Sequence, residues 1–235
     1  MSRATTLEEL CEWTGGEILR GRPEDRFTGT GIDSREVGDG DLFVAIVGPN
    51  HDAHGFVGDV LTKGVAGALV QSDRLEETLP RNGGFLVHVA DTTRALADLA
   101  RGHRRTFDGP VIGITGSNGK TTTKELCADI LSGCGPTLAT RGNLNNQFGV
   151  PLTLLRREDE HVRCVVEMGM NHRGEIAALA AIAEPTIGIL TNVGTAHIEF
   201  LGSREAIAEE KGDLLAALPE AGVAVVGRDQ PLAFV

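Results

Sequence analysis

The amino-acid sequence predicts an α/β protein in two parts. Residues 1–90 are expected to form a small mixed α/β domain, and residues 91–235 a mostly parallel sheet with flanking helices, incomplete at the C-terminus. The 235 residues are 41% hydrophobic and 23% charged, which is enough for two modest folded domains. From residue 111 onward, short apolar runs alternate with helical stretches, as in sheets built from strand–helix–strand crossovers. A glycine-rich turn separates the first of these strands from its helix.

The net charge of -11 limits the class of partner. Nucleic-acid binding is driven largely by basic side chains that displace counterions, so we expect no nucleic acid to bind. An anionic small molecule can still bind, because one lysine, backbone N–H groups or a metal ion can supply positive charge locally. We expect the chain to be a monomer.

The sequence predicts a cytoplasmic location. No apolar stretch approaches the roughly 18 to 20 residues that a membrane-spanning helix needs, so we expect no membrane insertion. The N-terminal "MSRATTLEELCEW" carries acids where a signal peptide has its apolar core. In a reducing compartment, four cysteines without C-x-x-C spacing are expected to be small hydrophobes with no chemistry. They are Cys11, Cys127, Cys134 and Cys164.

The first domain is expected to begin with a short helix in "TTLEELCEWTGG". Thr5 and Thr6 each have a glutamate three positions on, which is the capping-box pattern, and a double glycine ends the helical stretch. Short apolar and β-branched runs then predict five strands, with one more helix near 56–63. The predicted strands are 17–20, 28–33, 42–47, 68–70 and 85–89.

A helical stretch at 91–107 is expected to join the two domains, and its arginine cluster is typical of a solvated helix end. Beyond it, strands and helices alternate. The predicted strands are 111–115, 136–139, 162–167, 186–192 and 223–226, and the helices are 119–132, 148–157, 173–183 and 203–217. Because ligands gather beyond the carboxyl ends of parallel strands, the loops beginning at 115, 140, 167 and 192 are expected to share one rim.

The turn "TGSNGKTT" is typical of a loop that binds phosphate. Glycines allow close backbone approach, and N–H groups at the start of a helix face the anion. Lys120 is expected to reach the β and γ phosphates. The strict spacing G-x-x-x-x-G-K-[ST] is not met, because position 114 is Ile and the nearest glycine, Gly113, lies one residue earlier. The candidate cofactor-binding residues are Gly116, Ser117, Asn118, Gly119, Lys120, Thr121 and Thr122.

A bound nucleotide phosphate would need Mg²⁺, which takes oxygen ligands. The Thr121 hydroxyl is one candidate ligand. Glu167 is a second, because it ends an apolar run whose carboxyl end belongs to the same predicted rim. His197 and Lys211 follow the fourth strand of this part, but their spacing alone is typical of surface residues.

Four ordered stretches resemble the successive motifs of the Mur ligases: "GITGSNGKTTTKE", "TRGNLNNQFGVPLTLL", "EMGMNHRGEI" and "NVGTAHIEFLGSREAIAEEKGDLL". The N-terminal "GIDSREVGDGDLFVAIVGPNHDAHGFV" is similar to the uridine-nucleotide-binding segment of the same family. The resemblance covers nearly the whole chain. Members of this family continue well beyond 235 residues, so the resemblance implies a piece with an N-terminal domain and much of a central ATPase domain.

The resemblance implies an ATP-dependent ligase of peptidoglycan precursor synthesis. In the family, ATP phosphorylates the terminal carboxylate of a UDP-linked peptide, and an incoming amine attacks the acyl phosphate to give an amide, ADP and phosphate. The two middle motifs point to the branch that adds D-alanyl-D-alanine to UDP-N-acetylmuramoyl-tripeptide, and the chain by itself is not expected to form the amide efficiently.

The resemblance also implies roles for single residues. Lys120 matches the phosphate-binding lysine, and Thr121 and Glu167 match ligands of a first Mg²⁺. His197 matches a ligand of a second Mg²⁺. Lys211 matches a lysine that many members carry as a carbamate, which would make it a metal ligand. Carbamate formation requires the neutral amine, so we expect a lowered Lys211 pKa where the neighbouring acids do not oppose it.

The asparagines of "GNLNNQ" can hydrogen-bond a phosphate or carboxylate without adding negative charge, or they can merely shape a turn. Asn143, Asn145 and Asn146 are therefore the candidate substrate residues of this loop, and Asn145 joins Lys120, Lys211 and His197 as a candidate catalytic residue. In the first domain, the resemblance implies that the uridine diphosphate is held by Ser34, Arg35, Asn50 and His54. Arg35 can also be read as a surface charge. Asn171 and His172 receive no role.

The sequence leaves two other functions open and disfavours two more. "GRDQ" at 227–230 and "DAHGF" at 52–56 depart from the family pattern, so a diverged ligase for another carboxylate and amine stays open. A nucleotide-binding module without catalysis also stays open. A GTPase is disfavoured because no N-K-x-D tetrapeptide occurs, and a kinase leaves Glu167, His197 and Lys211 unexplained.

Overall fold

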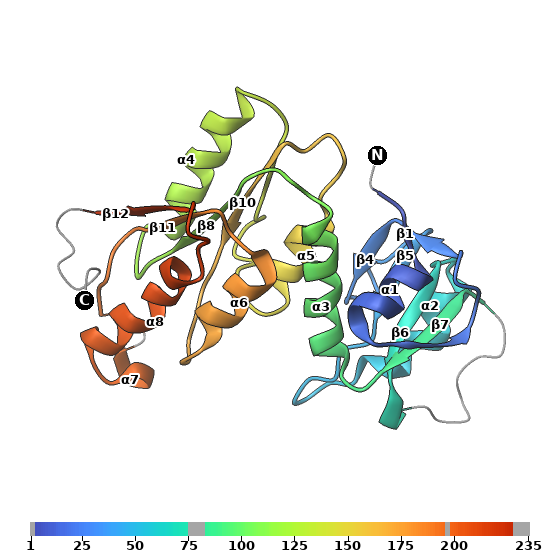
Figure 1. Cartoon of the computed structure of the whole chain (residues 1–235). Helices are drawn as coiled ribbons and strands as arrows, with labels where there is room; N and C mark the ends of the chain where they lie inside the picture. Colours follow the sequence, from blue (N-terminus) through green and yellow to red (C-terminus); the bar gives the residue numbers. More distant parts are fainter. Residues whose placement is uncertain (1–2, 75–82, 196–197, 228–235) are drawn as a thin grey trace. The chain divides into compact units, whose positions relative to one another are not determined.

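The computed structural model describes residues 3–74, 83–195 and 198–227 (Figure 1). The chain divides into two compact units, Met1–Gly102 and His103–Val235. Helix α3 (Thr92–Arg105) contains the point of division, whereas the sequence expectation put the boundary ahead of this helix. The α/β fold class is confirmed. Within the described ranges, no helix has both the length and the apolar character needed to cross a bilayer.

The first unit is built on a five-stranded sheet in the order β2-β7-β6-β5-β4. Strands β4, β5, β6 and β7 are parallel to one another, and β2 pairs antiparallel with β7. The strands are β2 (Glu17–Arg20), β4 (Gly29–Gly31), β5 (Asp41–Val44), β6 (Gly67–Gln71) and β7 (Phe85–Val89). A short pair outside this sheet joins β1 (Thr5–Thr6) to β3 (Arg26–Phe27).

The predicted strand 28–33 is wrong in its bounds, because this stretch of chain serves two sheets. Residues 26–27 pair with β1, whereas residues 29–31 pair with β5. Between them, the Thr28 N–H donates to the Gly40 carbonyl at 3.0 Å instead of joining either ladder. Strand β1 was not predicted, because two threonines directly before a helix are typical of helix-capping residues.

The predicted first helix is confirmed as α1 (Leu7–Thr14), and its capping box is present. The Thr6 hydroxyl accepts from the Glu9 N–H at 3.2 Å, and the Glu9 carboxylate accepts from the Thr6 N–H at 3.0 Å. Gly15 then ends the helix at φ 68°, a left-handed conformation that glycine adopts without strain.

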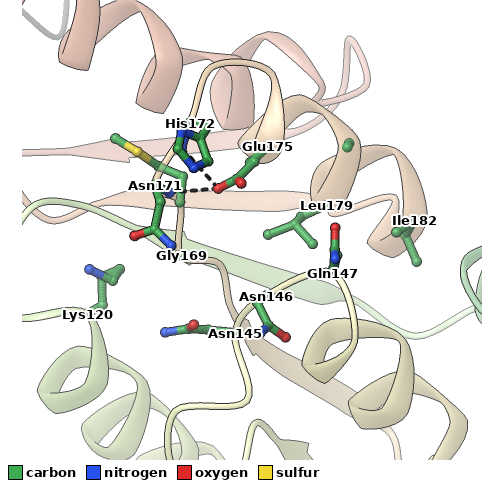
Figure 2. Close-up of a pocket in the computed structure, with 12 residues that line it drawn as sticks. Lys120, Asn145, Asn146, Gln147, Gly169, Asn171, His172, Glu175, Leu179 and Ile182 are labelled. Carbon is green, nitrogen blue, oxygen red and sulfur yellow. Dashed lines mark hydrogen bonds between the residues drawn. The ribbon is translucent and has the colours of Figure 1, made fainter. Parts of the chain in front are cut away.

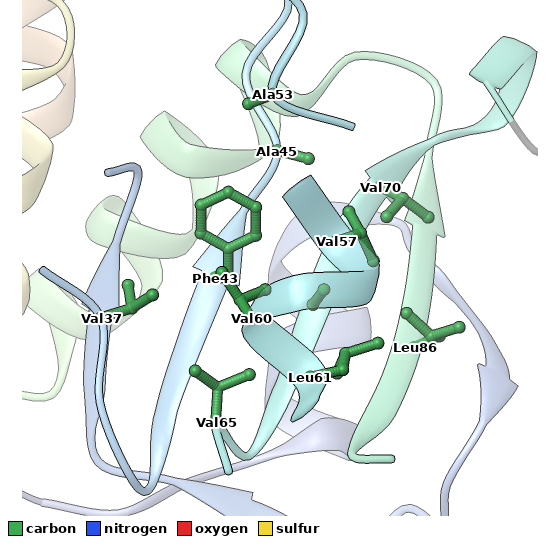
Figure 3. Close-up of a cluster of buried hydrophobic side chains, with 11 residues drawn as sticks. Val37, Phe43, Ala45, Ala53, Val57, Val60, Leu61, Val65, Val70 and Leu86 are labelled. Carbon is green, nitrogen blue, oxygen red and sulfur yellow. The ribbon is translucent and has the colours of Figure 1, made fainter. Parts of the chain in front are cut away.

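The core of the first unit lies between the sheet and the helical segment η1 (Ala53–Phe56) with α2 (Val57–Thr62) (Figure 3). Phe43 and Val57 are fully buried there. Each such side chain stabilises the fold by about 1.5–3 kcal/mol relative to exposure. The cluster comprises Val37, Phe43, Ala45, Ala53, Val57, Val60, Leu61, Val65, Ala68, Val70 and Leu86.

The second unit contains a five-stranded sheet in which every pair is parallel, in the order β12-β11-β8-β10-β9. The strands are β8 (Val111–Thr115), β9 (Thr137–Ala139), β10 (Arg163–Glu167), β11 (Ile187–Leu190) and β12 (Val223–Val226). All five residues of β8 are buried, as expected for a central strand covered on both faces.

Helices cover both faces of this sheet, with α4 on one side and α6 and α8 on the other (Figure 1). The helices are α4 (Lys120–Ser132), α5 (Gly149–Leu155), α6 (Glu175–Ala183), α7 (Ile198–Leu201) and α8 (Arg204–Ala216). The prediction missed the short α7, because four residues are too few to show a helical period. The other four helices follow the predicted segments to within two residues at each end.

Each sheet brings several loops together at the carboxyl ends of its parallel strands. In the second unit, β8 lies between β10 and β11, and β9 lies beside β10. The predicted shared rim is therefore confirmed for the loops after β8, β9, β10 and β11, called here the phosphate-loop rim. In the first unit, the loops after β4, β5 and β6 meet in the same way and are called the first-unit rim.

Candidate phosphate, metal and substrate site

The turn between β8 and α4 depends on two glycines. A Cβ on Gly116 would lie 1.9 Å from Thr191 Oγ1, and its φ of 152° is unfavourable for other residues. Gly119 has φ 78° and stands at the N-cap of α4 without a side-chain cap. The first N–H groups of a helix have no intrahelical partner, so the start of α4 can bind an anion.

The end of β11 supports this turn from the side. The Ser117 N–H donates to the Asn192 carbonyl and the Asn118 N–H donates to Asn192 Oδ1, both at 3.0 Å. The Thr191 hydroxyl donates to the Asn118 carbonyl at 2.7 Å. The N–H groups of Ser117 and Asn118 are thus already occupied. A bound phosphate would therefore accept hydrogen bonds from the N–H groups of residue 119 and those that follow. Sequence reasoning missed Thr191 and Asn192, although both stand at a predicted strand end on this rim.

Lys120 heads α4 and folds back over the turn. Its Nζ donates to the Gly116 carbonyl at 2.8 Å. Burial lowers the Lys120 pKa, and the nearby Glu167 carboxylate opposes this effect. A phosphate on the first amides of α4 would lie beside this ammonium group.

Glu167, at the end of β10, is a buried carboxylate with incomplete partners. It is 1% exposed. Its Oε1 accepts from the Thr121 hydroxyl at 3.3 Å and from Asn145 Nδ2 at 2.8 Å, while Oε2 has no hydrogen-bond partner among the described residues. In that same part of the chain, no lysine, arginine or histidine forms an ion pair with it.

These residues fit a divalent cation. An unpaired carboxylate in the interior carries an effective desolvation penalty of several kcal/mol, which a hard cation would offset. Thr121 and Glu167 offer the oxygen ligands that Mg²⁺ prefers. The described ranges hold no group of three or more His, Cys, Asp or Glu side chains suited to a metal. Phosphate oxygens and waters would complete the shell, as is usual for Mg²⁺.

Lys211 lies on α8 and is 2% exposed. Burial and the charge of Lys120 lower the Lys211 pKa to about 8, against the opposing effect of Glu210. The expected pKa depression is therefore present. The Glu210 carboxylate accepts from the Gly174 and Ile176 N–H groups at the start of α6, at 2.7 and 2.9 Å. Carbamylation of Lys211 stays a prediction, and His197 falls outside the described residues.

The asparagine loop ahead of α5 has mixed roles. Asn145 donates to Glu167, and its carbonyl accepts from the Gly169 N–H at 2.8 Å. Asn146 Oδ1 accepts from the Phe148 and Gly149 N–H groups at 3.1 and 2.9 Å, which caps the start of α5. Asn143 is exposed. The turn-shaping reading thus holds for Asn146, and contact of these three residues with substrate stays a prediction.

A cavity of about 490 Å³ opens beside Lys120 and Asn145 (Figure 2). Its opposite wall comes from the loop after β10 and from α6. Glu175, Leu179 and Ile182 line it from positions i, i+4 and i+7, which lie on one face of a helix. The sequence shows the same period, but sequence reasoning missed these three residues. The remaining lining residues are Asn146, Gln147, Gly169, Met170, Asn171, His172 and Ala178.

On the first-unit rim, Arg35 is paired with Asp33. Arg35 Nε donates to Asp33 Oδ1 at 2.9 Å, and its side chain is 85% exposed. Hydrogen bonds from Arg35 hold the Asp33 pKa well below its usual range. The Ser34 carbonyl accepts from Lys63 Nζ at 3.0 Å, and Asn50 is exposed. The surface-charge reading of Arg35 matches this geometry, and its contact with a nucleotide stays a prediction.

His54 is engaged on both ring nitrogens. Nε2 accepts from the Gln71 N–H at 2.8 Å, and Nδ1 lies 2.6 Å from Asp52 Oδ1. Because Nε2 acts as an acceptor, the ring is the neutral tautomer that donates from Nδ1. His54 therefore holds the loop after β5 against the end of β6, a role that sequence reasoning missed.

The comparisons with known proteins agree with one another. The family model described as "Mur ligase middle domain" matches residues 114–234. A UDP-N-acetylmuramoyl-tripeptide--D-alanyl-D-alanine ligase from Synechocystis is 49% identical over 201 residues, covering 85% of this chain and 43% of the relative. The ligase of the same name from Escherichia coli is 41% identical over 226 residues, covering 96% of this chain and 48% of that protein.

Two solved structures extend the comparison. A crystal structure of MurF from Acinetobacter baumannii has a TM-score of 0.89 and 37% identity, covering 98% of this chain and 50% of that chain. MurF from Thermotoga maritima in complex with ADP has a TM-score of 0.77 and 35% identity, covering 86% of this chain and 46% of that chain. The chain spans about half the length of the curated relatives it matches.

Proposed function

The chain belongs to the Mur ligase family. On that premise, we propose that its function is that of an ATP-dependent amide ligase acting on UDP-N-acetylmuramoyl-tripeptide and D-alanyl-D-alanine. The relatives that are 49% and 41% identical carry the name of this ligase, and the Thermotoga maritima MurF structure holds ADP. We assign ATP to the second unit and the uridine nucleotide to the first.

One observation carries the proposal: side chains from α4 and from the asparagine loop converge on the Glu167 carboxylate at the end of β10. Thr121 and Asn145 both donate to Glu167 Oε1, and Lys120 heads the same helix as Thr121. A phosphate site and a site for a hard cation thus share one rim. This is the arrangement that phosphoryl transfer needs, because its catalysis is almost entirely positioning and charge stabilisation.

The proposed reaction has two steps. An oxygen of the peptide carboxylate forms a bond to the γ-phosphorus of ATP, and the bond from that phosphorus to the β-γ bridging oxygen breaks, which releases ADP. The amine of D-alanyl-D-alanine then attacks the acyl carbon. The carbon–nitrogen bond forms, the bond to the phosphate oxygen breaks, and the amine loses a proton as phosphate leaves.

The residues of the rim account for the charge in the first step. The amides at the start of α4 and the Lys120 ammonium would hold the phosphates, which reduces repulsion with the incoming carboxylate. Thr121 and Glu167 would hold Mg²⁺, which when bound supplies positive charge to the β and γ oxygens. Asn145 orients the Glu167 carboxylate through its 2.8 Å hydrogen bond.

Lys211 supports the proposal through its surroundings. A lysine with a pKa of about 8 is partly neutral near neutral pH, and the neutral amine is the form that reacts with CO₂. The carbamate would exchange a buried positive charge near Lys120 for a negative one that can bind a cation. We propose this modification for the ATP-loaded enzyme.

Nucleotide titration of the 235-residue chain tests the proposal. We expect ADP to bind in the presence of Mg²⁺, and Lys120→Ala to weaken ADP binding about 100-fold through loss of a desolvated ion pair. UDP-N-acetylmuramoyl-tripeptide should still bind that variant within about threefold, because its uridine site lies on the other unit. If Lys120→Ala leaves ADP affinity unchanged, the phosphate site is misassigned.

Phosphate release with UDP-N-acetylmuramoyl-tripeptide and D-alanyl-D-alanine tests the second step. Because the relatives are about twice as long as this chain, we expect the 235 residues alone to bind nucleotide without efficient ligation. Robust, D-alanyl-D-alanine-dependent release by the 235-residue chain would refute that expectation and would still support the proposed reaction.

A further inference from the structure

The peptide group between Asn118 and Gly119 is held on its carbonyl side by the end of β11. The Asn118 carbonyl accepts from the Thr191 hydroxyl at 2.7 Å and from Asn192 Nδ2 at 3.1 Å. Asn192 Oδ1 accepts from the Asn118 N–H at 3.0 Å, so one side-chain amide pairs with both backbone groups of Asn118. A carbonyl oxygen has two lone pairs, and two donors use both of them. The direction of this carbonyl is therefore fixed before any ligand binds.

The other half of the same peptide group is open. Within the described ranges, the Gly119 N–H donates no hydrogen bond. Because the peptide group is planar and trans, this N–H points opposite to the Asn118 carbonyl. The carbonyl faces β11, and β8 lies between β11 and β10. The N–H is therefore directed toward the side of the phosphate-loop rim where Glu167 ends β10.

The hydrogen bonds on the carbonyl also change the strength of this donor. Linked hydrogen bonds polarise one another, so donors on the Asn118 oxygen make the Gly119 N–H a stronger donor. A hydrogen bond to an ionised acceptor such as phosphate contributes more than one to a neutral acceptor. Thr191 and Asn192 thus prepare the Gly119 N–H for an anion without touching that anion themselves.

We propose that Thr191 and Asn192 are positioning residues for the nucleotide phosphate, which act by aiming the Gly119 N–H at it. The inference rests on the proposed function, because it takes the anion at the start of α4 to be a phosphate of ATP. Neither side chain lines the cavity beside Lys120, so this role is separate from contact with a substrate there. Loss of either donor frees the carbonyl to rotate, which turns the N–H away from the phosphate.

A purely structural role of Thr191 predicts a different result, and Thr186 provides the matched control. Thr186 stands directly before β11, at the opposite end of this strand from Thr191, and its hydroxyl oxygen accepts from the Val111 N–H at 3.2 Å. Valine keeps the shape of threonine and removes its hydroxyl. If the hydroxyls only tie the β11 segment to its neighbours, Thr186→Val and Thr191→Val should weaken nucleotide binding alike. If Thr191 aims the phosphate donor, Thr191→Val alone should weaken it.

Calorimetric titration of the 235-residue chain with ADP and Mg²⁺ measures these affinities. We expect Thr191→Val to bind ADP about tenfold more weakly, which is about 1.4 kcal/mol. Asn192→Ala should lose at least as much, because it also removes the partner of the Asn118 N–H. Thr191→Ser keeps the hydroxyl and should stay within about threefold of the unmodified chain, as should Thr186→Val.

The backbone amide proton of Gly119 gives a second readout, which a general loss of stability would not imitate. In the unmodified chain, its NMR signal should move downfield when ADP binds, because the N–H then donates to an anion. In Thr191→Val saturated with ADP, the movement should be smaller. In Thr186→Val it should equal that of the unmodified chain.

Three outcomes overturn the inference and leave the proposed function intact. One is ADP binding by Thr191→Val or Asn192→Ala that equals binding by the unmodified chain. Another is an equal loss of affinity in Thr186→Val and Thr191→Val, and the third is a Gly119 signal that does not move when ADP binds. If the unmodified chain binds no ADP, the proposed function fails together with the inference.

Discussion

The two rims of this protein are built alike but hold their charges differently. Both collect loops at the carboxyl ends of parallel strands. On the phosphate-loop rim, Lys120 and Lys211 are buried or partly buried, and both have lowered pKa values. On the first-unit rim, Arg35 pairs with Asp33, and Arg74 Nε pairs with Asp52 at 3.1 Å.

The two rims therefore differ in how far their charges are compensated without a ligand. Within the described ranges, neither Lys120 nor Lys211 forms an ion pair with a carboxylate, and Glu167 Oε2 has no hydrogen-bond partner, so the charges of this rim are incompletely compensated without a ligand. Arginines already paired with aspartates form a surface whose charges are satisfied without a ligand.

Gly116→Ala should be the most damaging substitution, because the phosphate-loop turn has no room for a Cβ. The new atom would meet Thr191 Oγ1 at 1.9 Å, and φ is 152°. Overpacking and backbone strain together should lower the free energy of unfolding by about 2–4 kcal/mol, measured by chemical denaturation. The control Gly58→Ala has open space in helix α2, so it should be neutral or slightly stabilising.

Lys211 should make stability rise with pH above about 8. Its pKa is about 8 in the folded chain and about 10.4 when unfolded, so the unfolded chain binds more protons between these values. The free energy of unfolding therefore increases with pH across that window, by at most about 3 kcal/mol, and the gain is absent below pH 8. Lys211→Met should remove this pH-dependent increase in denaturation experiments carried out without bicarbonate, and an identical slope in both chains would contradict the assignment.

Glu167→Gln should stabilise the chain without metal while abolishing the effect of the metal. The amide removes a buried charge whose Oε2 has no described partner, so the free energy of unfolding should rise by about 1 kcal/mol. Millimolar Mg²⁺ with ADP should raise the melting temperature of the unmodified chain but not that of the variant. A variant that melts lower without metal would show that the Glu167 charge is compensated.

Arg35→Ala should have the smallest effect on stability. The Arg35 side chain is 85% exposed, and exposed ion pairs contribute little. We expect no measurable shift in melting temperature. The affinity for a uridine nucleotide, measured on the same samples, tests whether Arg35 leaves Asp33 to bind the diphosphate. If Arg35→Ala leaves this affinity unchanged, Arg35 is a surface charge only.

Local patterns in the sequence were enough to predict the glycine turn before α4 and the shared rim. Gly116, Gly119 and Lys120 lie within five consecutive residues, and their conformational requirements are set by their immediate neighbours. Glu167 could be placed because parallel strands align their carboxyl ends, which is a consequence of topology.

Partnerships between distant segments could not be predicted in the same way. The support of Ser117 and Asn118 by Asn192 depends on how closely β11 approaches the turn. The tautomer of His54 depends on a backbone N–H seventeen residues away, and the direction of the Glu210 carboxylate depends on the packing of α8 against α6. Such details follow from side-chain geometry, for which a residue pattern carries no signal.

The most direct test of the shared phosphate and metal site is a crystal structure of this chain with ADP and Mg²⁺. We expect a cation held by the Thr121 hydroxyl oxygen and, directly or through one water, by Glu167, with the β-phosphate on the first amides of α4 beside Lys120. A nucleotide bound away from α4, or a cation that neither Thr121 nor Glu167 holds, would contradict it.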